Sequence, residues 1–492
     1  MRRILTTIAV TAAFVSLTSV RAQDSKATLE AAAKALGDVS TIEFSGSGTN
    51  NSYGQAFKPG DPWPAFKVTT YKVDVDYKAP AMQMELQRTN PDVKPIRGGG
   101  GLPLLAPQTQ NQAVSGKVAW NTAAPAPTPA MAAVNDRLIA LWGGGSAGAA
   151  SWVGTPQGVI KGALANNATV AGRVITFNAM GTSVKATLNA QNLVDKVETK
   201  ADAPVLGDVV LETTYSNYKD FGAVKFPTHI VQMEGGFPVL DITVTDVKPN
   251  ASVSIAVPQN VQQAQPAAPA SVRVQTDKIA DGVYYLTGGS HHSVAVEFND
   301  YVVVFEAPQN DERAMAVLEA TRKTIPNKPI RYVVNSHNHF DHLGGVRAAM
   351  AEGITIITQA QNRAYYERIA TMPHTIVPDR LAKSPKKPAI EAVAEKRVLT
   401  DATQTLELYR VPNNHTDTML VGYLPKAKIL IEADLWNPPA TNAPAPTAIS
   451  PVTAAFFDSL QRMKLDVSKV AGLHGRLAEM KEFQAAAGKS TH

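Results

Sequence analysis

The N-terminal half of the chain is marked by polar and apolar residues that alternate with a period of two. A strand places successive side chains on opposite faces, so this alternation predicts antiparallel strands with one face in water. Before them, residues 26–37 carry a helical apolar pattern that ends in glycine, which predicts a short amphipathic helix. We therefore expect a mainly antiparallel β domain over residues 23–256, with strands at 41–45, 68–77, 82–87, 172–177, 183–188, 209–215 and 241–247.

The C-terminal half mixes strand and helix patterns. Between the halves, residues 257–271 are rich in Pro, Ala and Gln, which is typical of a linker. A chain of 492 residues is also too long for one ordinary core. We therefore expect an α+β protein whose second domain covers residues 272–492, with strands at 282–287, 293–298, 301–306 and 330–334 and a helix at 311–324.

The first 22 residues have the three regions of a secretory signal. Two arginines follow Met1, an apolar stretch runs from Ile4 to Val15, and Val20 and Ala22 fit cleavage after Ala22. The apolar stretch is shorter than the ~20 residues that a membrane-spanning helix needs. We therefore expect residues 1–22 to be removed, the mature protein to be periplasmic or secreted, and the mature chain to contain no membrane span.

Charge and cysteine content narrow the range of partners. The formal net charge is +5 and the chain has no long basic run, so nothing indicates a nucleic-acid partner. Cysteine is absent, so an exported chain carries no disulfide and cannot offer a thiolate to a metal.

The segment from Ser336 to Gly345 concentrates the candidate chemistry, because three histidines and an aspartate follow an apolar strand pattern within six residues. His337 and His339 are two apart, so on an extended backbone they point the same way and can share one ion. Asp341 and His342 follow where the chain turns and can face a second ion. Imidazole and carboxylate ligands suit Zn²⁺, and the same ligands accept Mn²⁺ or Fe²⁺. The alternative, unrelated surface histidines, fits this spacing poorly.

The pattern His337-x-His339-x-Asp341-His342 resembles the signature of the metallo-β-lactamase superfamily. Three further motifs of that family follow in order, centred on His415, Asp434 and His474. The resemblance covers residues 272 to the C-terminus and implies an αββα sandwich for this domain. The helix and β meander of the N-terminal domain faintly resemble the half-barrel of periplasmic lipoprotein-carrier proteins in the order of their elements.

The resemblance implies a dinuclear zinc centre. In it a hydroxide between two Zn²⁺ ions attacks the substrate, and no protein nucleophile is needed. Asp341 and Asp434 are the carboxylates at the reacting centre. The first ion is held by His337, His339 and His415, the second by Asp341, His342 and His474, and Asp434 bridges both.

Asp434 directs the functional prediction. The resemblance associates a bridging aspartate with lactonases, thioesterases and phosphodiesterases more than with β-lactamases. We therefore expect an exported dinuclear zinc hydrolase that acts on a small-molecule ester, lactone, thioester or amide. Two alternatives stay open: a metallo-β-lactamase that hydrolyses β-lactams, and a non-catalytic ligand-binding protein with a degenerate metal domain.

Several other polar residues are weighed as functional or structural. His291 and His292 lie between two predicted strands, where they are candidate substrate contacts or an exposed hairpin tip. Asp417 either orients a metal ligand or caps a loop. Glu306 is interpreted as structural. Three remaining histidines are taken as unrelated to the site: His229, His374 and His492.

Overall fold

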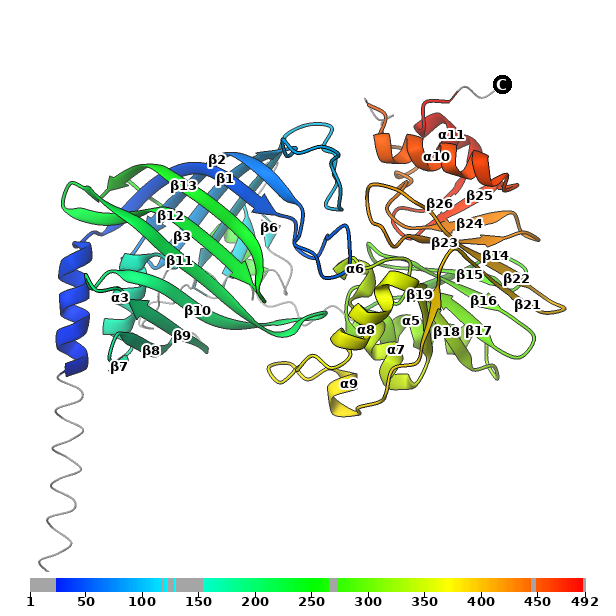
Figure 1. Ribbon diagram of the computed structural model, residues 1–492, viewed down its shortest axis with the longest axis horizontal. Coiled ribbons are helices and arrows are strands. Elements are labelled where there is room, and N and C mark those ends of the chain that lie inside the picture. The colour runs from blue at the N-terminus through cyan, green and yellow to red at the C-terminus, as the bar shows by residue number, and fades with distance from the viewer. Residues whose placement is uncertain are drawn as a thin grey trace, which may run out of the picture.

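The computed structural model describes residues 24–116, 118–122, 128–129, 154–179, 181–264, 272–443 and 448–489. The predicted signal sequence 1–22 and His492 lie outside the described residues. Two parts of the molecule are evident in Figure 1, a large curved sheet and a layered C-terminal part.

The N-terminal part is one antiparallel sheet, as the alternating pattern predicted. Among the described residues, thirteen strands follow the order β6-β5-β4-β3-β2-β1-β13-β12-β11-β10-β9-β8-β7. The strands are β1 (Thr41–Asn51), β2 (Ala65–Asp76), β3 (Ala81–Thr89), β4 (Gln108–Ser115), β5 (Val118–Asn121), β6 (Thr128–Pro129), β7 (Thr169–Ala171), β8 (Val174–Ala179), β9 (Thr182–Leu188), β10 (Val194–Ala203), β11 (Gly207–Phe221), β12 (Val224–Glu234) and β13 (Phe237–Pro249).

Two helices pack against this sheet. Residues 24–36 are helical and stop at Gly37, whose φ of +81° is the left-handed value that glycine tolerates best, as the sequence predicted. Leu29 and Leu36 of this helix, and Val159 of α3 (Pro156–Ala165), are buried in one core with the inward side chains of the strands. The predicted mainly antiparallel β domain is confirmed.

The C-terminal part contains two sheets. The seven-stranded sheet has the order β14-β15-β16-β17-β18-β19-β20, with parallel pairing from β17 to β20. The six-stranded sheet has the order β21-β22-β23-β24-β25-β26. The strands are β14 (Gln275–Ala280), β15 (Val283–Thr287), β16 (Ser293–Glu297), β17 (Val302–Phe305), β18 (Ile330–Val334), β19 (Thr355–Gln359), β20 (Ile390–Val393), β21 (Lys396–Thr400), β22 (Thr405–Arg410), β23 (Leu420–Leu424), β24 (Ile429–Glu432), β25 (Lys469–Gly472) and β26 (Leu477–Glu479).

Helices cover the outer faces of the two sheets, which gives the predicted αββα order (Figure 1). Side chains such as Phe305 and Leu406 fill the core between the sheets. The first sheet is covered by α5 (Asp311–Thr324), α6 (Phe340–Leu343), α7 (Val346–Glu352), η1 (Ala360–Asn362), α8 (Arg363–Ile369) and α9 (Arg380–Lys383), and the second by α10 (Pro451–Met463) and α11 (Met480–Ala486).

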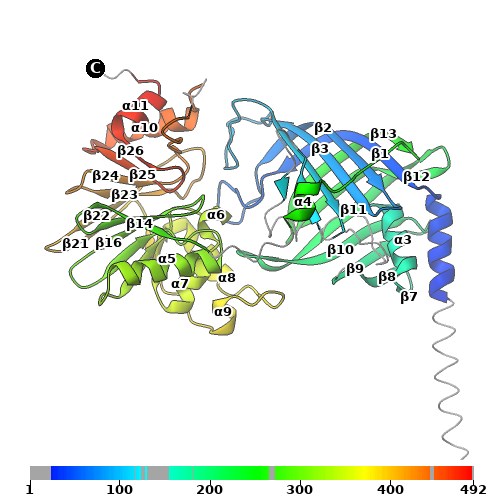
Figure 2. The same ribbon diagram turned by 180° about the vertical axis from the view of Figure 1, so that it is seen from behind.

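The predicted linker differs from expectation in its first half. Residues Gln259–Gln263 form helix α4, seen from behind in Figure 2. Val261 of this helix is fully buried against Ala113 and Trp120 of the N-terminal sheet. Composition does not predict this helix, because the segment is mostly polar and a single apolar side chain, Val261, packs it against the sheet. Residues 265–271 lie outside the described residues.

The two domains share an apolar interface. Trp63, from the loop after β1, stacks on Phe237 at 4.9 Å between ring centroids and meets Phe340 of α6 edge-on at 5.9 Å. Tyr53 meets the same Phe340 ring at 5.3 Å. Burial of such aromatic rings contributes strongly to packing, so the loop after β1 is anchored beside α6.

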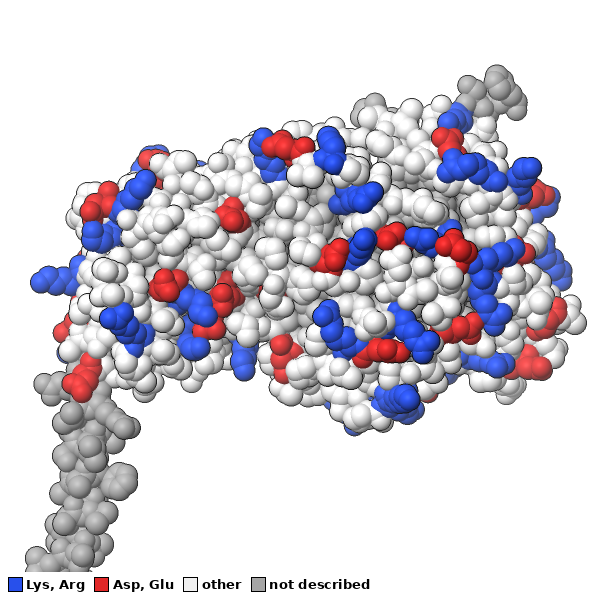
Figure 3. Space-filling view, in the orientation of Figure 1, with Lys and Arg blue, Asp and Glu red and all other residues white. Residues whose placement is uncertain are grey.

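Two surface properties bear on the predicted partners. None of the helices in the described part of the chain combines the length and apolar character needed to cross a bilayer. On the face shown in Figure 3, basic and acidic side chains are interspersed and do not gather into one basic surface.

Candidate metal centre

Strand β18 delivers the histidine motif to the edge of the sheets. The strand ends at Val334, and the chain then passes through Asn335 to His339 before α6 begins at Phe340. The turn after α6 is tight: a Cβ on Gly344 would lie 1.8 Å from the carbonyl oxygen of Gln309. Only glycine fits this close backbone approach, which holds the motif loop beside the loop after β17.

The described side chains form two groups whose ligand atoms lie within 4.8 Å of one another. We name them the first group, His337, His339, His415 and Asp434, and the second group, His291, Asp341, His342 and His474.

The first group is deeply buried. His337 and His339 have no solvent exposure, and the Nε2 atom of His337 lies 2.9 Å from the Nδ1 atom of His339. His415, from the loop between β22 and β23, places its Nε2 atom 3.0 Å from Oδ2 of Asp434. Asp434 follows β24 and also lies 3.2 Å from Nε2 of His337.

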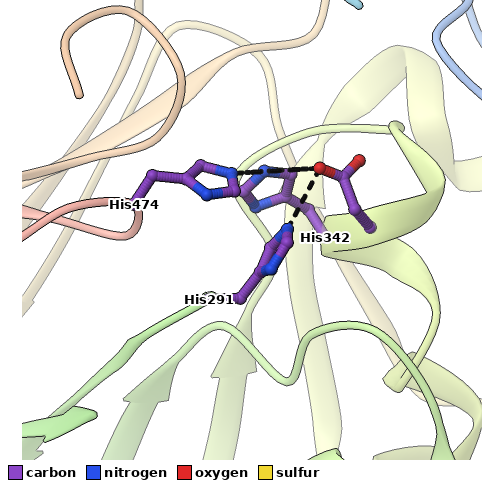
Figure 4. A group of neighbouring side chains, drawn as sticks. His291, His342 and His474 are labelled. Carbon is purple, nitrogen blue, oxygen red and sulfur yellow. Dashed lines mark hydrogen bonds and ion pairs between the residues drawn. The ribbon is translucent and has the colours of Figure 1, made fainter. Parts of the chain in front are cut away.

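The second group surrounds one carboxylate oxygen (Figure 4). The Nε2 atoms of three histidines approach Oδ2 of Asp341, His291 to 3.1 Å, His342 to 3.6 Å and His474 to 3.9 Å. These residues come from three places in the chain: the loop between β15 and β16, helix α6, and the loop after β25. Tertiary folding thus assembles this group.

Asp434 contacts both groups. Its Oδ2 atom lies 3.2 Å from Nε2 of His342, and its Oδ1 atom lies 2.9 Å from Nε2 of His474. The backbone of Asp434 has a φ of +63°, the left-handed region that only Gly, Asn and Asp visit at moderate cost. Such strain occurs where the surrounding structure holds a side chain for a function.

The nitrogen atoms are arranged to hold a cation. Nδ1 of His342 lies 2.9 Å from Oε2 of Glu306, and Nδ1 of His474 lies 3.2 Å from the carbonyl oxygen of Ser290. Both oxygens accept, so each Nδ1 donates its hydrogen, and in the neutral rings the lone pairs are on the Nε2 atoms. These two Nε2 atoms lie 3.1 Å apart. Facing lone pairs repel unless a cation lies between them, so the donor set fits a divalent metal ion.

Electrostatics favour the ligand forms of these side chains. Burial lowers the pKa of His337 to about 4 and holds the pKa of His339 well below its usual value. Burial raises the pKa of Asp341, but His342 and His291 outweigh it and hold that pKa below its ordinary value. Neutral imidazoles beside an ionised carboxylate are the forms that bind metal.

His342 differs from the other histidines. Burial alone would lower its pKa, but Asp434, Asp341 and Glu306 outweigh the burial and raise the pKa well above its ordinary value. The centre therefore attracts positive charge at the position where the two groups meet.

Comparison with known proteins identifies the family of this part of the chain. A family model described as "Metallo-beta-lactamase superfamily" matches residues 286–440. This stretch contains every predicted ligand except His474. The C-terminal domain belongs to the metallo-β-lactamase superfamily. The prediction from the histidine motif is confirmed for this domain, and the superfamily uses divalent metals.

Curated relatives match a shorter stretch. A linear primary-alkylsulfatase from a Pseudomonas species is 33% identical over 76 residues, which is 15% of this chain and 11% of the relative. The alkyl/aryl-sulfatase BDS1 from Saccharomyces cerevisiae is 32% identical over 76 residues, 15% of this chain and 12% of the relative. Among solved structures, the metallo-β-lactamase FIM-1 from Pseudomonas aeruginosa is 22% identical, with a TM-score of 0.33 over 45% of this chain and 96% of that chain.

Within the superfamily domain, Glu306 has a role that sequence reasoning missed. It directly follows β17, is fully buried and has a φ of +73°. Besides His342, its carboxylate accepts the backbone N–H of Ser336 at 2.6 Å and the Nδ2–H of Asn335 at 3.2 Å. Glu306 thus orients His342 from behind, as carboxylates commonly do for metal-binding histidines. The available signal was a carboxylate at the end of a buried strand.

His291 and His292 separate in the structure. His291 belongs to the second group of possible metal ligands, although the sequence had indicated it only as a candidate substrate contact. His292 points elsewhere, and its Nε2 atom lies 2.8 Å from the carbonyl oxygen of Gly475. Two adjacent histidines point in different directions, and the sequence does not tell which of the two faces the site.

The remaining candidates lie outside both groups. Asp417 pairs with the guanidinium of Arg410 at 3.0 Å and is a member of neither group. Its neighbour Asn413 caps the loop, because its Oδ1 atom accepts the backbone N–H groups of His415 and Thr416. Among the described histidines, three belong to neither group: His229, His292 and His374.

Proposed function

We propose that the protein is an exported, dinuclear zinc hydrolase that cleaves an ester, lactone, thioester or amide bond of a small molecule. The observation that carries the proposal is the position of Asp434, whose two oxygens lie 3.0 Å from His415 and 2.9 Å from His474. One carboxylate thereby reaches a histidine of each group. Two ions held side by side can act together on one substrate, as in other dinuclear hydrolases.

The proposed ligand sets follow the two groups. When bound, the ions supply Lewis-acid polarisation of the substrate oxygen and water of lowered pKa. The first ion would be held by His337, His339, His415 and Asp434, and the second by Asp341, His342 and His474, with Asp434 available to both and His291 as an additional ligand.

The protein supplies orientation and a dry environment. His337, His339 and His342 have no solvent exposure, so bulk water is excluded from one side of the centre. Electrostatic interactions are stronger there than in water. Glu306 keeps the Nε2 atom of His342 directed at the centre, because it accepts the hydrogen on Nδ1.

A second candidate is hydrolysis of a sulfate ester. It is favoured by the names of the two curated relatives, a linear primary-alkylsulfatase and an alkyl/aryl-sulfatase. The same ions would polarise a sulfuryl oxygen instead of a carbonyl oxygen. The β-lactam alternative shares the chemistry of the first proposal, whereas a non-catalytic binding protein would not need the complete ligand set that is present.

A substrate panel tests the proposal. The mature protein is loaded with Zn²⁺, its metal content is counted, and turnover of esters, lactones, thioesters, amides, β-lactams and alkyl sulfates is measured with and without a chelator. We expect about two ions per chain and chelator-sensitive turnover of an ester, lactone, thioester or amide. Turnover of alkyl sulfates alone supports hydrolysis of a sulfate ester, and turnover of β-lactams alone supports the β-lactamase alternative. Turnover that survives complete metal removal contradicts all three.

Export rests on the signal-like residues 1–22. Its test is the N-terminus of the protein recovered from the native host. A mature chain that begins at Gln23 outside the cytoplasm supports export, and an intact Met1 inside the cytoplasm contradicts it.

A further inference from the structure

The loop that joins β1 to β2 in the N-terminal domain reaches α6 in the C-terminal domain (Figures 1 and 2). The backbone N–H of Phe340 donates to the carbonyl oxygen of Gly54 at 3.2 Å. The next residues of the loop, Gln55 and Ala56, therefore lie directly beside the histidine motif.

Gln55 contacts a residue of the second group. Its Nε2 atom donates to Oδ1 of Asp341 at 2.9 Å, and its Oε1 atom accepts the backbone N–H of Gly100 at 2.9 Å. A backbone N–H only donates, so this bond fixes the orientation of the amide and directs its NH₂ toward Asp341. With Oδ1 engaged, Oδ2 is the oxygen that faces His291 and His342.

Ala56 contacts a residue of the first group through its backbone. Its carbonyl oxygen lies 3.2 Å from Nε2 of His339 and accepts the Nδ2–H of Asn338 at 3.0 Å. A carbonyl only accepts, so Nε2 of His339 carries the hydrogen. The lone pair is then on Nδ1, the atom that faces His337.

A second loop of the N-terminal domain, between β3 and β4, closes over the first. The N–H of Gly99 donates to the carbonyl oxygen of Gln55 at 3.0 Å, and the N–H of Gly98 donates to the carbonyl oxygen of Asn414 at 2.9 Å. A Cβ on Gly99 would lie 2.0 Å from Oε1 of Gln55 and 2.6 Å from Cε1 of His339. This contact leaves no room for a side chain, so glycine permits the approach.

We infer that the N-terminal β domain is a working part of the metal centre, in which Gln55 and the carbonyl of Ala56 position one ligand of each group. The inference rests on the proposed function, since it concerns the ligands of the proposed ions. Outer hydrogen-bond partners of metal ligands commonly change metal affinity by about 10–100-fold. Gln55 is a positioning residue, because it acts through Asp341.

The test compares the full-length mature protein with Gln55→Leu, which keeps the size of the side chain and removes both of its hydrogen-bonding groups. The control is Gln87→Leu, an exposed glutamine on β3 of the same domain. Each protein is titrated with Zn²⁺ against a competing chelator, and Co²⁺-loaded protein is examined by visible absorption. The unfolding temperature of the metal-free protein reports folding separately.

We expect Gln55→Leu to bind one of the two ions about 10–100-fold more weakly, to change the Co²⁺ spectrum, and to unfold at the wild-type temperature without metal. Gln87→Leu should match the wild type in all three measurements. Gly99→Ala is a second variant. We expect it to lower the affinity of the first group for its ion, because the added Cβ would displace His339.

The outcomes separate this inference from the proposed function. Wild-type protein that binds no divalent ion overturns the proposed function and the inference together. Wild-type protein that binds two ions, with unchanged affinities and Co²⁺ spectra in Gln55→Leu and Gly99→Ala, overturns the inference alone.

Discussion

The Nε2 atoms of His342 and His474 face each other at 3.1 Å, although 131 residues separate them in the chain. In each ring the Nδ1–H donates to an oxygen, a carboxylate oxygen of Glu306 for His342 and the carbonyl oxygen of Ser290 for His474. Without a cation between them, the two Nε2 lone pairs repel each other; a bound cation attracts both. We therefore expect metal binding to stabilise the folded protein.

Removal of metal is therefore expected to lower stability. A ligand that binds only the native state at 100 times its dissociation constant stabilises by about 2.7 kcal/mol. We expect a chelator to lower the unfolding temperature of Zn²⁺-loaded protein, and added Zn²⁺ to restore it. Calorimetry with and without the chelator measures the change. An unfolding temperature that is the same in both conditions would contradict the coupling.

Asp434→Asn tests the shared carboxylate. Asparagine tolerates the left-handed backbone at this position, so the change removes charge without added strain. We expect bound metal to fall and kcat/KM to drop by at least about 100-fold, because both groups lose an anionic neighbour. Metal analysis and kinetics measure the two effects. The control is Asp466→Asn, whose side chain is 73% exposed. Full activity in Asp434→Asn would exclude the dinuclear mechanism.

Glu306→Gln tests the residue behind His342. The variant keeps an oxygen for the N–H of Ser336 but presents an NH₂ group to the Nδ1–H of His342. We expect the second ion to bind about 10–100-fold more weakly and the metal-free protein to lose about 1–3 kcal/mol of stability. Metal competition and urea unfolding provide these values. Glu319→Gln, on the exposed surface of α5, is the control and should leave both unchanged.

His291 and His292 form a matched pair for substitution. We expect His291→Ala to weaken binding of the second ion, because its Nε2 atom lies 3.1 Å from Oδ2 of Asp341. We expect His292→Ala to lower stability by about 1–3 kcal/mol instead, since it breaks a buried contact with Gly475. Metal titration and urea unfolding of both variants distinguish these roles. Equal metal affinity in the two variants would remove His291 from the ligand set.

Asp202 gives a prediction about pH that does not involve the metal centre. Burial, followed by the charges of Asp208 and Asp379, raises its pKa from 3.8 to about 6. A raised folded-state pKa disfavours the ionised form in the native state. The stability linked to protonated Asp202 is therefore complete below pH 3.8 and is lost as the pH rises to about 6.

We expect Asp202→Asn to stabilise the metal-free protein by about 1–2 kcal/mol above pH 6, and to give much less gain near pH 4. Urea unfolding at several pH values in the presence of a chelator measures this difference. Asp195→Asn, at an exposed position on β10, is the control. A gain that does not change with pH would show that Asp202 does not titrate in this range.

The alternating pattern of the N-terminal half predicted seven of its thirteen described strands, because period two is a property of the extended backbone itself. Composition was less informative for residues 259–263, which form a helix where a linker was predicted. The reason is that docking of Val261 depends on Ala113 and Trp120, which lie far away in the chain. A local pattern does not record such partners.

For the centre, the sequence by itself determined the motif from His337 to His342, because the spacing of four ligands on one strand end and one turn is set by local backbone geometry. Only the tertiary structure decided that His291 joins the second group, that Glu306 holds His342, and that Gln55 reaches Asp341 from another domain. These contacts join segments that are distant in sequence. They depend on the packing of whole sheets and loops, which no spacing within one segment encodes.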